Sequence, residues 1–314
     1  MLSRVADSLF WLGRYAERIE ANTHIITRQL ERIIEHSLND ETMEKECEAL
    51  IKICGYYDDF HLRYKDYNFN DVIEYLLFDK ENYNSIVALA ESARFNLKNT
   101  RDLVPQELWE VWQDLYDLIQ TFSNSPRSMM EVTAFLKQIR ISSFTATGII
   151  DSLMSRDESF MFVKIGKWLE RAEKTSLILK TLLLLKVENE YSFAANYVLY
   201  LTNTYEDFNN RHISHEELDV LQYIVGDEKC TRAIHYSVKK IHRTIVDLQN
   251  GQYETYTDLL FKELYDLKMI LRKDCHKLTL EERVEWVKSI HAHCMHFGPI
   301  FSRTYFLTPP ILVN

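Results

Sequence analysis

Glycine and proline are scarce in this sequence of 314 residues, which contains 7 glycines and 5 prolines. Doubly wound α/β enzymes use glycine freely in turns and phosphate-binding loops, so this scarcity argues against that class. The sequence also lacks a glycine-rich phosphate loop, a nucleophile elbow, a cysteine-protease motif and zinc-finger spacing. It therefore favours long helices with short connections, and it predicts no cofactor.

Long apolar runs and paired cysteines are missing as well. The longest apolar run, near residues 177–185, is interrupted by Lys180 and is too short to span a bilayer. The chain does not open on a basic stretch followed by an apolar one, so no secretory leader is expected. The five cysteines form no C-x-x-C pair and no even set, which predicts reduced thiols in a cytoplasmic protein.

Charge of one sign is not concentrated anywhere. The formal net charge is −10, with acidic and basic residues interleaved along the chain. Nucleic-acid binding usually requires a basic stripe or patch. We therefore expect neither nucleic acid nor a membrane among the partners.

Long amphipathic helices are what the sequence does contain. Mostly apolar residues recur in alternating steps of four and three from Val5 to Ile33, and again from Phe162 to Leu183. This spacing is the a/d seam of a packed helix. Gly13 and Gly166 interrupt these helices, although glycine inside a helix costs about 1 kcal/mol relative to alanine. We predict that the two helices cross closely at these glycines.

The same local sequence appears twice. Residues 9–20 return at 162–173 with a shared glycine, a basic residue, an aromatic residue and Glu-Arg-x-Glu. Weaker matches pair 71–79 with 219–227, 114–118 with 263–267, and 148–150 with 298–300, in the same order and at nearly constant offset. We predict one domain, 1–314, made of two tandem repeats, 1–155 and 156–314, related by a pseudo-two-fold axis.

The predicted fold is therefore an all-α helical bundle. The first half is expected to form helices at 4–35, 41–55, 69–78, 82–102, 106–122 and 127–154. The second half is expected to form them at 158–187, 190–206, 215–225, 230–249, 254–274 and 279–306.

Four carboxylates in the repeated stretch are the first candidate site: Glu17, Glu20, Glu170 and Glu173. The i,i+3 spacing places each pair on one helix face. Such a cluster suits acid/base catalysis or metal binding. The alternative is a buried Glu–Arg network that fixes helix register. Di-metal bundles use Glu-x-x-His, but Thr23 and Ser176 stand where that motif has histidine.

A basic helix face is the second candidate. Arg94, Lys98 and Arg101 lie at i, i+4 and i+7, close to Asn96, and the second half has no equivalent series. A basic face can hold a carboxylate or phosphate. The alternatives are a solvated face or partners for the carboxylates. The candidate ligand-binding residues are Arg14, Arg18, Arg94, Asn96, Arg101 and Arg171.

A histidine-rich stretch is the third candidate. His291 with Cys294, and His293 with His296, have the i,i+3 spacing that can seat a transition metal. No distant ligands of matching spacing accompany them. Core packing or a histidine-rich helix surface is the preferred interpretation, and the sequence predicts no metal.

Several motifs resemble the bacterial alpha-E domain family. They are Leu2-Ser3-Arg4-x-Ala6, Phe10 to Arg18, Ala93-Arg94-x-Asn96, Gly166 to Glu173, and Thr231-Arg232-Ala233, a variant of the family's Pro-Arg-Ser. Ile19 and Lys98 depart from the family's usual alanine and arginine. The resemblance covers nearly the whole chain and implies a helical protein encoded beside circularly permuted ATP-grasp ligases and transglutaminase-like peptidases.

The resemblance implies a role in making, modifying or degrading a peptide or amide-linked product. We expect a helical accessory or binding protein that acts with the ligase or the transglutaminase-like protein and holds a peptide or a small anionic ligand. The alternatives are an enzyme of the same pathway that uses the carboxylate and arginine cluster, or a purely structural scaffold.

Overall fold

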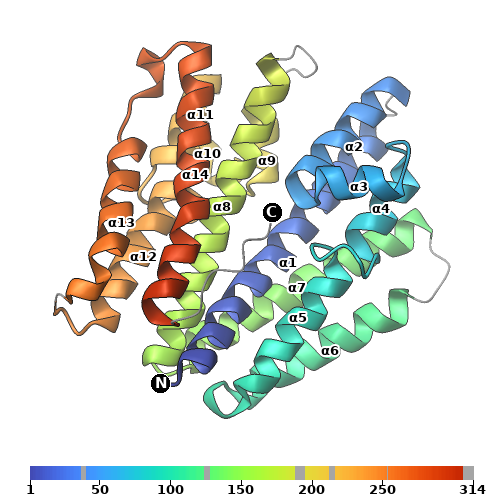
Figure 1. The fold of residues 1–314 in the computed structure, drawn as a ribbon. Helices are drawn as coiled ribbons and strands as arrows, with labels where there is room; N and C mark the ends of the chain where they lie inside the picture. Colours follow the sequence, from blue (N-terminus) through green and yellow to red (C-terminus); the bar gives the residue numbers. More distant parts are fainter. Residues whose placement is uncertain (37–39, 124–127, 188–194, 212–215, 253, 307–314) are drawn as a thin grey trace. The chain divides into compact units, whose positions relative to one another are not determined.

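The computed structural model describes residues 1–36, 40–123, 128–187, 195–211, 216–252 and 254–306. Most of these residues are helical, and no strand occurs among them (Figure 1). The predicted all-α fold class is confirmed. Contacts divide the chain into two compact units. Unit 1 is Met1–Arg14 with Arg156–Asn314, and unit 2 is Tyr15–Ser155. The predicted repeats also divide at residue 155, but the first 14 residues pack with the second part of the chain.

Unit 1 is built on four long helices. α8 packs against both α12 and α14, and α13 packs against the same two helices, which closes a four-helix arrangement. Most residues of α8 are buried, so it is the core helix of this unit. The helices after the first segment of α1 are α8 (Glu158–Val187), α9 (Ala195–Leu201), α10 (Tyr205–Arg211), α11 (Glu217–Gly226), α12 (Ile234–Leu248), α13 (Asp258–Leu271) and α14 (Leu280–Tyr305).

The first segment of α1 (Ser3–His36) crosses α8 at the two predicted glycines. A Cβ added at Gly13 would collide with the carbonyl oxygen of Val163, and one added at Gly166 would collide with that of Phe10. Glycine is therefore required at both positions because each helix backbone lies against the other. The predicted close crossing is confirmed.

Unit 2 contains the remainder of α1, and its later helices pack in succession, α5 on α6 and α6 on α7. Ser85 caps α5 by accepting from the backbone N–H of Ala88, and Ser128 forms a capping box with Glu131 at the start of α7. The helices are α2 (Asp40–Cys54), α3 (Tyr57–Arg63), α4 (Phe69–Leu77), α5 (Ile86–Asn99), α6 (Gln106–Ser123) and α7 (Met129–Leu153).

Most expected helices are found close to their predicted ends. The helices expected at 230–249 and 254–274 start four residues late, at Ile234 and Asp258, and there are other differences. The helix expected at 82–102 starts at Ile86, because the backbone from Asp79 to Ser85 forms a turn and Ser85 is the cap. The short helix α3 was not expected. The range 190–206 contains α9 and the start of α10, and its residues 190–194 lie outside the described residues.

The same contacts recur in the two units at an offset of 148 residues (211 − 63). Arg63 pairs with Asp59 and Asp79 in unit 2, and Arg211 pairs with Asp207 and Asp227 in unit 1. The hydroxyl of Tyr75 donates to Asp59, and that of Tyr223 donates to Asp207. These contacts support the predicted duplication. The duplication and its pseudo-two-fold axis stay a prediction.

Candidate functional site

Arg14 joins two of the predicted carboxylates inside unit 1. Its Nε donates to Oε2 of Glu170 at 2.8 Å, and its Nη2 lies 2.7 Å from the same oxygen and also bonds Oε2 of Glu173. The exposed fractions of Arg14, Glu170 and Glu173 are 6%, 2% and 7%. The structure thus places one guanidinium between two carboxylates that are one helical turn apart on α8.

The space for this guanidinium comes from a glycine on α14. A Cβ at Gly298 would lie 3.3 Å from Nη1 of Arg14, tighter than an ordinary contact. On its other side, Arg14 lies over Trp11, with 5.2 Å between the guanidinium carbon and the ring centroid. Phe10 stacks on Phe301 of α14 at 5.0 Å. The cluster is therefore enclosed by an aromatic wall and a glycine, as expected for a packed network.

Arg171, the arginine of the second Glu-Arg dipeptide, has a different role. Its Nη1 donates to the carbonyl oxygen of Thr231 at 3.1 Å, and the hydroxyl of Thr175 donates to the carbonyl of Arg232 at 3.2 Å. Both bonds hold the segment before α12 against α8. This explains why Thr231-Arg232-Ala233 occurs together with the Glu-Arg motif.

Arg18 makes the corresponding contact within unit 2. Its Nη1 donates to Oδ1 of Asn84 at 3.0 Å, in the segment before α5. Glu17 and Glu20 lie on α1 in this unit and are buried, with exposed fractions of 4% and 5%. Both arginines that follow a motif glutamate therefore anchor the segment that leads into a long helix.

The predicted basic face lies within unit 2, in the second half of α5 and just after it. Arg94 donates to Gln113 and lies over Tyr116, both on α6, and Arg101 lies over Trp109 of the same helix. The side-chain amide of Asn96 donates to the carbonyl of Ser92 in its own helix. Arg94 of α5 and Arg101 just after it therefore contact α6, and ligand binding by this basic face stays a prediction.

The histidine-rich stretch divides between a core contact and a surface contact. Nδ1 of His291 lies 3.0 Å from the hydroxyl of Ser176 on α8, and burial lowers the pKa of His291 to about 4, assisted by the charges of Lys180 and Lys174. Burial raises the pKa of the Cys294 thiol well above its usual range, and the charge of Glu173 acts in the same direction.

The other two histidines of this stretch face α13. Nδ1 of His293 lies 2.5 Å from Oε1 of Glu263, and Nδ1 of His296 lies 3.5 Å from its Oε2. Within the described ranges, no group of three or more His, Cys, Asp or Glu side chains is arranged to hold a metal ion. The four candidates thus do not converge on one point.

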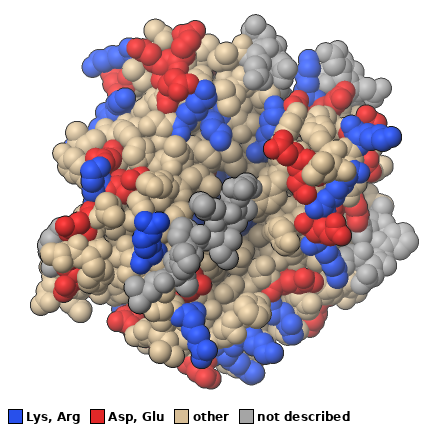
Figure 2. All heavy atoms as spheres, in the orientation of Figure 1, with Lys and Arg blue, Asp and Glu red and all other residues tan. Residues whose placement is uncertain are grey.

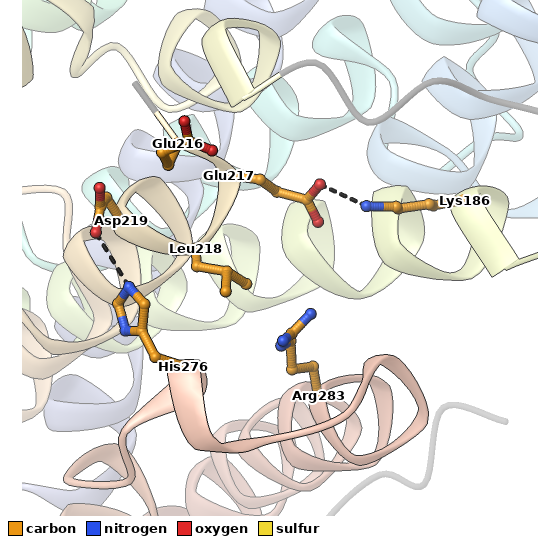
Figure 3. Close-up of a pocket in the computed structure, with 7 residues that line it drawn as sticks. All are labelled: Lys186, Glu216, Glu217, Leu218, Asp219, His276 and Arg283. Atoms are coloured by element: carbon orange, nitrogen blue, oxygen red, sulfur yellow. Dashed lines mark hydrogen bonds and ion pairs between the residues drawn. The ribbon is translucent and has the colours of Figure 1, made fainter. Parts of the chain in front are cut away.

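A pocket of about 390 Å³ lies in unit 1 at the ends of four elements, and the sequence did not predict it (Figure 3). Lys186 lies in the last turn of α8, Arg283 lies near the start of α14, and His276 belongs to the 3₁₀ turn Cys275–Lys277. No local sequence motif connects residues so far apart, so only the fold reveals them. The lining residues are Lys186, Glu216, Glu217, Leu218, Asp219, His276 and Arg283.

Cys275 stands beside this pocket next to His276, but the pair is not a nucleophilic dyad. The thiol is fully buried, and its sulfur donates to the carbonyl of Leu218 at 3.3 Å. Burial raises the pKa of Cys275 to about 11, so the thiolate is scarce at neutral pH. His276 is instead held by Asp219 and Asp274.

Lys, Arg, Asp and Glu are interspersed over the face of the molecule shown in Figure 2. No described helix is both long and apolar enough to cross a bilayer. The fold and the site together define a class of all-helical proteins in which Glu-Arg dipeptides secure helices to one another and to the segments between them.

The comparisons with known proteins give the particular family. The family model for Alpha-E, "a predicted alpha-helical domain with a conserved ER motif", matches residues 1–306. The chain belongs to the Alpha-E family. It is 23% identical, over 338 aligned residues, to an uncharacterized protein of Mycobacterium bovis and to one of Mycobacterium tuberculosis. The match covers 98% of this chain and 37% of each relative, and no solved structure matches.

Proposed function

We propose that this chain is a non-catalytic helical partner of an ATP-grasp-type amide ligase and a transglutaminase-like protein in the making or modification of a peptide or amide-linked product. The observation that carries the proposal is the length of the relatives. The region similar to this chain accounts for only 37% of each mycobacterial protein, so there it adjoins a larger stretch of other polypeptide. A helical unit attached to other polypeptide is typical of an accessory module.

The use of the motif residues supports a binding role over catalysis. Glu170 and Glu173 are engaged by Arg14, and Arg171 holds a backbone carbonyl. These contacts fix helices and a connecting segment within unit 1, which supports our assignment of the bond-forming chemistry to the partner ligase. The five cysteines are free thiols, in keeping with the cytoplasmic location that we propose.

The direct test uses a purified ATP-grasp-type amide ligase, the proposed partner. The tagged chain is expected to retain the purified ligase on affinity resin and to raise its turnover. The matched control is Gly166→Ala, which should disrupt the crossing of α1 with α8 and weaken both effects. If the wild-type chain neither retains the ligase nor alters its turnover, the proposal is wrong.

The alternative, an enzyme that uses Glu17, Glu20, Glu170 and Glu173, is separated by a second variant. Apolar residues of similar volume often replace a buried ion network without loss of stability. The triple variant Arg14→Met/Glu170→Met/Glu173→Leu should therefore fold, retain the ligase and still raise its turnover. A folded triple variant that binds the ligase but has lost all pathway activity would support the enzyme.

A further inference from the structure

The pocket of unit 1 presents charges of both signs to one space (Figure 3). Lys186 and Glu217 form an ion pair at one side, and Asp219 pairs with His276 at another, with 3.0 Å between Oδ1 and Nε2. Within each pair the two charges neutralise each other. Two groups remain with bonding capacity directed at the pocket, one on Glu217 and one on Arg283.

The first group is the second carboxylate oxygen of Glu217. Its Oε2 is bound by Lys186, whereas its Oε1 is buried and accepts no hydrogen bond from any residue that the structure describes. A buried acceptor without a donor costs about 1–3 kcal/mol. A donor that entered the pocket would recover this free energy.

The second group is the end of the Arg283 guanidinium. Its Nε donates to the carbonyl of Cys275 at 3.1 Å, which fixes the plane of the group. No described residue accepts a hydrogen bond from its Nη1 or Nη2, and Figure 3 shows the guanidinium directed at the space below Glu217. A guanidinium held in this way presents two parallel N–H donors, a fork that can bind both oxygens of a carboxylate.

We propose that this pocket binds a small zwitterion of the amino-acid class. The ligand carboxylate would accept from Nη1 and Nη2 of Arg283, and the ligand ammonium would donate to Oε1 of Glu217. Leu218 supplies the apolar wall between the two charged ends. The volume of about 390 Å³ lies in the range of pockets that hold small molecules.

Ligands of a single charge fit the lining less well. Glu216, Glu217 and Asp219 would repel a phosphate or another dianion, and a simple cation would leave the Arg283 fork without an acceptor. A zwitterion satisfies both ends at once. The link to amide-bond chemistry rests on the function proposed above, whereas binding by the isolated chain does not.

The test measures binding to the purified chain alone, by calorimetry and by saturation-transfer NMR. The probes are L-alanine and L-alanyl-L-alanine as zwitterions, with propionate and ethylamine as the single-charge controls. We expect at least one zwitterion to bind tenfold or more tightly than either control. The comparison of alanine with the dipeptide shows whether the pocket takes a free amino acid or a short peptide.

Variants identify the two contacts. Arg283→Gln should weaken zwitterion binding about tenfold or more, since it removes charge-assisted hydrogen bonds. Arg283→Lys keeps the charge but loses the fork, and it should weaken binding as well. Glu217→Gln should weaken the zwitterions but leave propionate unchanged. The matched control Arg303→Gln, an exposed arginine elsewhere on α14, should bind as the wild type does.

Thermal melts confirm that each variant is folded before binding is compared. The proposal is wrong if neither zwitterion binds at millimolar concentration, if propionate or ethylamine binds as tightly, or if folded Arg283→Gln and Glu217→Gln bind as the wild type does. Because no ligase is present, a negative result here leaves the association with the ligase as a separate question, and the reverse also holds.

Discussion

Arg14 holds two carboxylates of a helix that begins more than 140 residues later in the chain, and all three side chains are buried. A buried ion network contributes little net stability relative to apolar packing. Removal of its cation or of all its anions, however, leaves a charge buried in a low-dielectric interior without a partner. Arg14 therefore fixes the register of α1 on α8 more than it adds to the free energy of unfolding.

The first prediction concerns Glu170. Glu170→Ala should lower the free energy of unfolding by about 1–3 kcal/mol, because Nε of the buried Arg14 loses its acceptor while Glu173 still balances the charge. Glu170→Gln should cost less, since it preserves shape and one acceptor. Chemical denaturation measures both. Glu285→Ala, in an exposed pair with Lys288 on α14, is the control and should change little. A loss as small as that of the control would show that the cluster is not a stabilising network.

The second prediction concerns the pH dependence of stability. The pKa of His291 is about 4 in the folded protein, lowered by burial, and near 6.5 when unfolded. Between these two pKa values the unfolded chain therefore binds more protons than the folded protein. The contribution of neutral His291 to the free energy of unfolding is complete above pH 6.5 and is lost as the pH falls toward 4. His291→Asn retains a donor for Ser176 and should flatten this part of the curve.

The control for this measurement is His296→Asn, which alters an exposed histidine of the same helix. Melting temperatures from pH 7 to pH 4 compare the three proteins. If His291→Asn falls as steeply as the wild type and His296→Asn, another group causes the acid loss.

For single residues, the sequence predicted a buried Glu–Arg network as one of two alternatives, but it did not predict which arginine bonds Glu170 and Glu173. The predicted Glu–Arg network assigned no particular pair, and the arginines adjacent to the glutamates, Arg18 and Arg171, bond Asn84 and the carbonyl of Thr231. The actual partner, Arg14, follows Gly13 at the helix crossing. The arginine that pairs with a glutamate is determined by which side chains the helix crossing brings together. The spacing of residues along the sequence does not contain that information.

Among the elements, the crossing of α1 with α8 has the strictest requirement. Backbone lies against backbone at Gly13 and Gly166, so a methyl group has no room at either position. The heptad spacing predicted both helices, and the cost of glycine in a helix predicted the crossing. In contrast, α3 and α10 were missed because a helix of seven residues shows too little periodicity. The repetition of Tyr-x-Asp-Phe-x-x-Arg at 57–63 and 205–211 was the available indication.

The third prediction tests that crossing. Gly13→Ala and Gly166→Ala should each destabilise the protein by about 1–3 kcal/mol or more, because the added methyl group meets a carbonyl oxygen. Gly148→Ala is the matched control. Nothing lies within 4 Å of the added Cβ there, so alanine should stabilise α7 by up to about 1 kcal/mol. Thermal melts of the three variants decide, and stabilisation by all three would contradict the close approach.

For the whole molecule, the sequence predicted one fold class and a division near residue 155, but not the assignment of the first 14 residues to unit 1. Sequence repeats follow the order of the chain, whereas compact units follow contacts. The helix α1 serves both units, so a boundary drawn on repeats cannot coincide with one drawn on contacts.

The fourth prediction compares the two units. The hydroxyls of Tyr75 and Tyr223 donate to matched aspartates, Asp59 and Asp207. If the two halves are duplicates, Tyr75→Phe and Tyr223→Phe should each lower stability by about 1 kcal/mol, the typical contribution of one hydrogen bond. Denaturation of the two single variants and of the double variant measures this. Clearly unequal losses would show that the matched contacts carry different weight.

The discontinuity of unit 1 has a consequence for biosynthesis. Residues 15–155 leave the ribosome as one uninterrupted stretch, so unit 2 is complete while unit 1 is still missing most of its chain. Phe10 and Gly13, whose backbones lie against α8, are made about 150 residues before that helix, a delay of roughly 8–30 s at ordinary elongation rates. Throughout that interval the buried apolar residues of this part of α1 stay without their partner helix, and it is there that a nascent chain of this family would engage a chaperone.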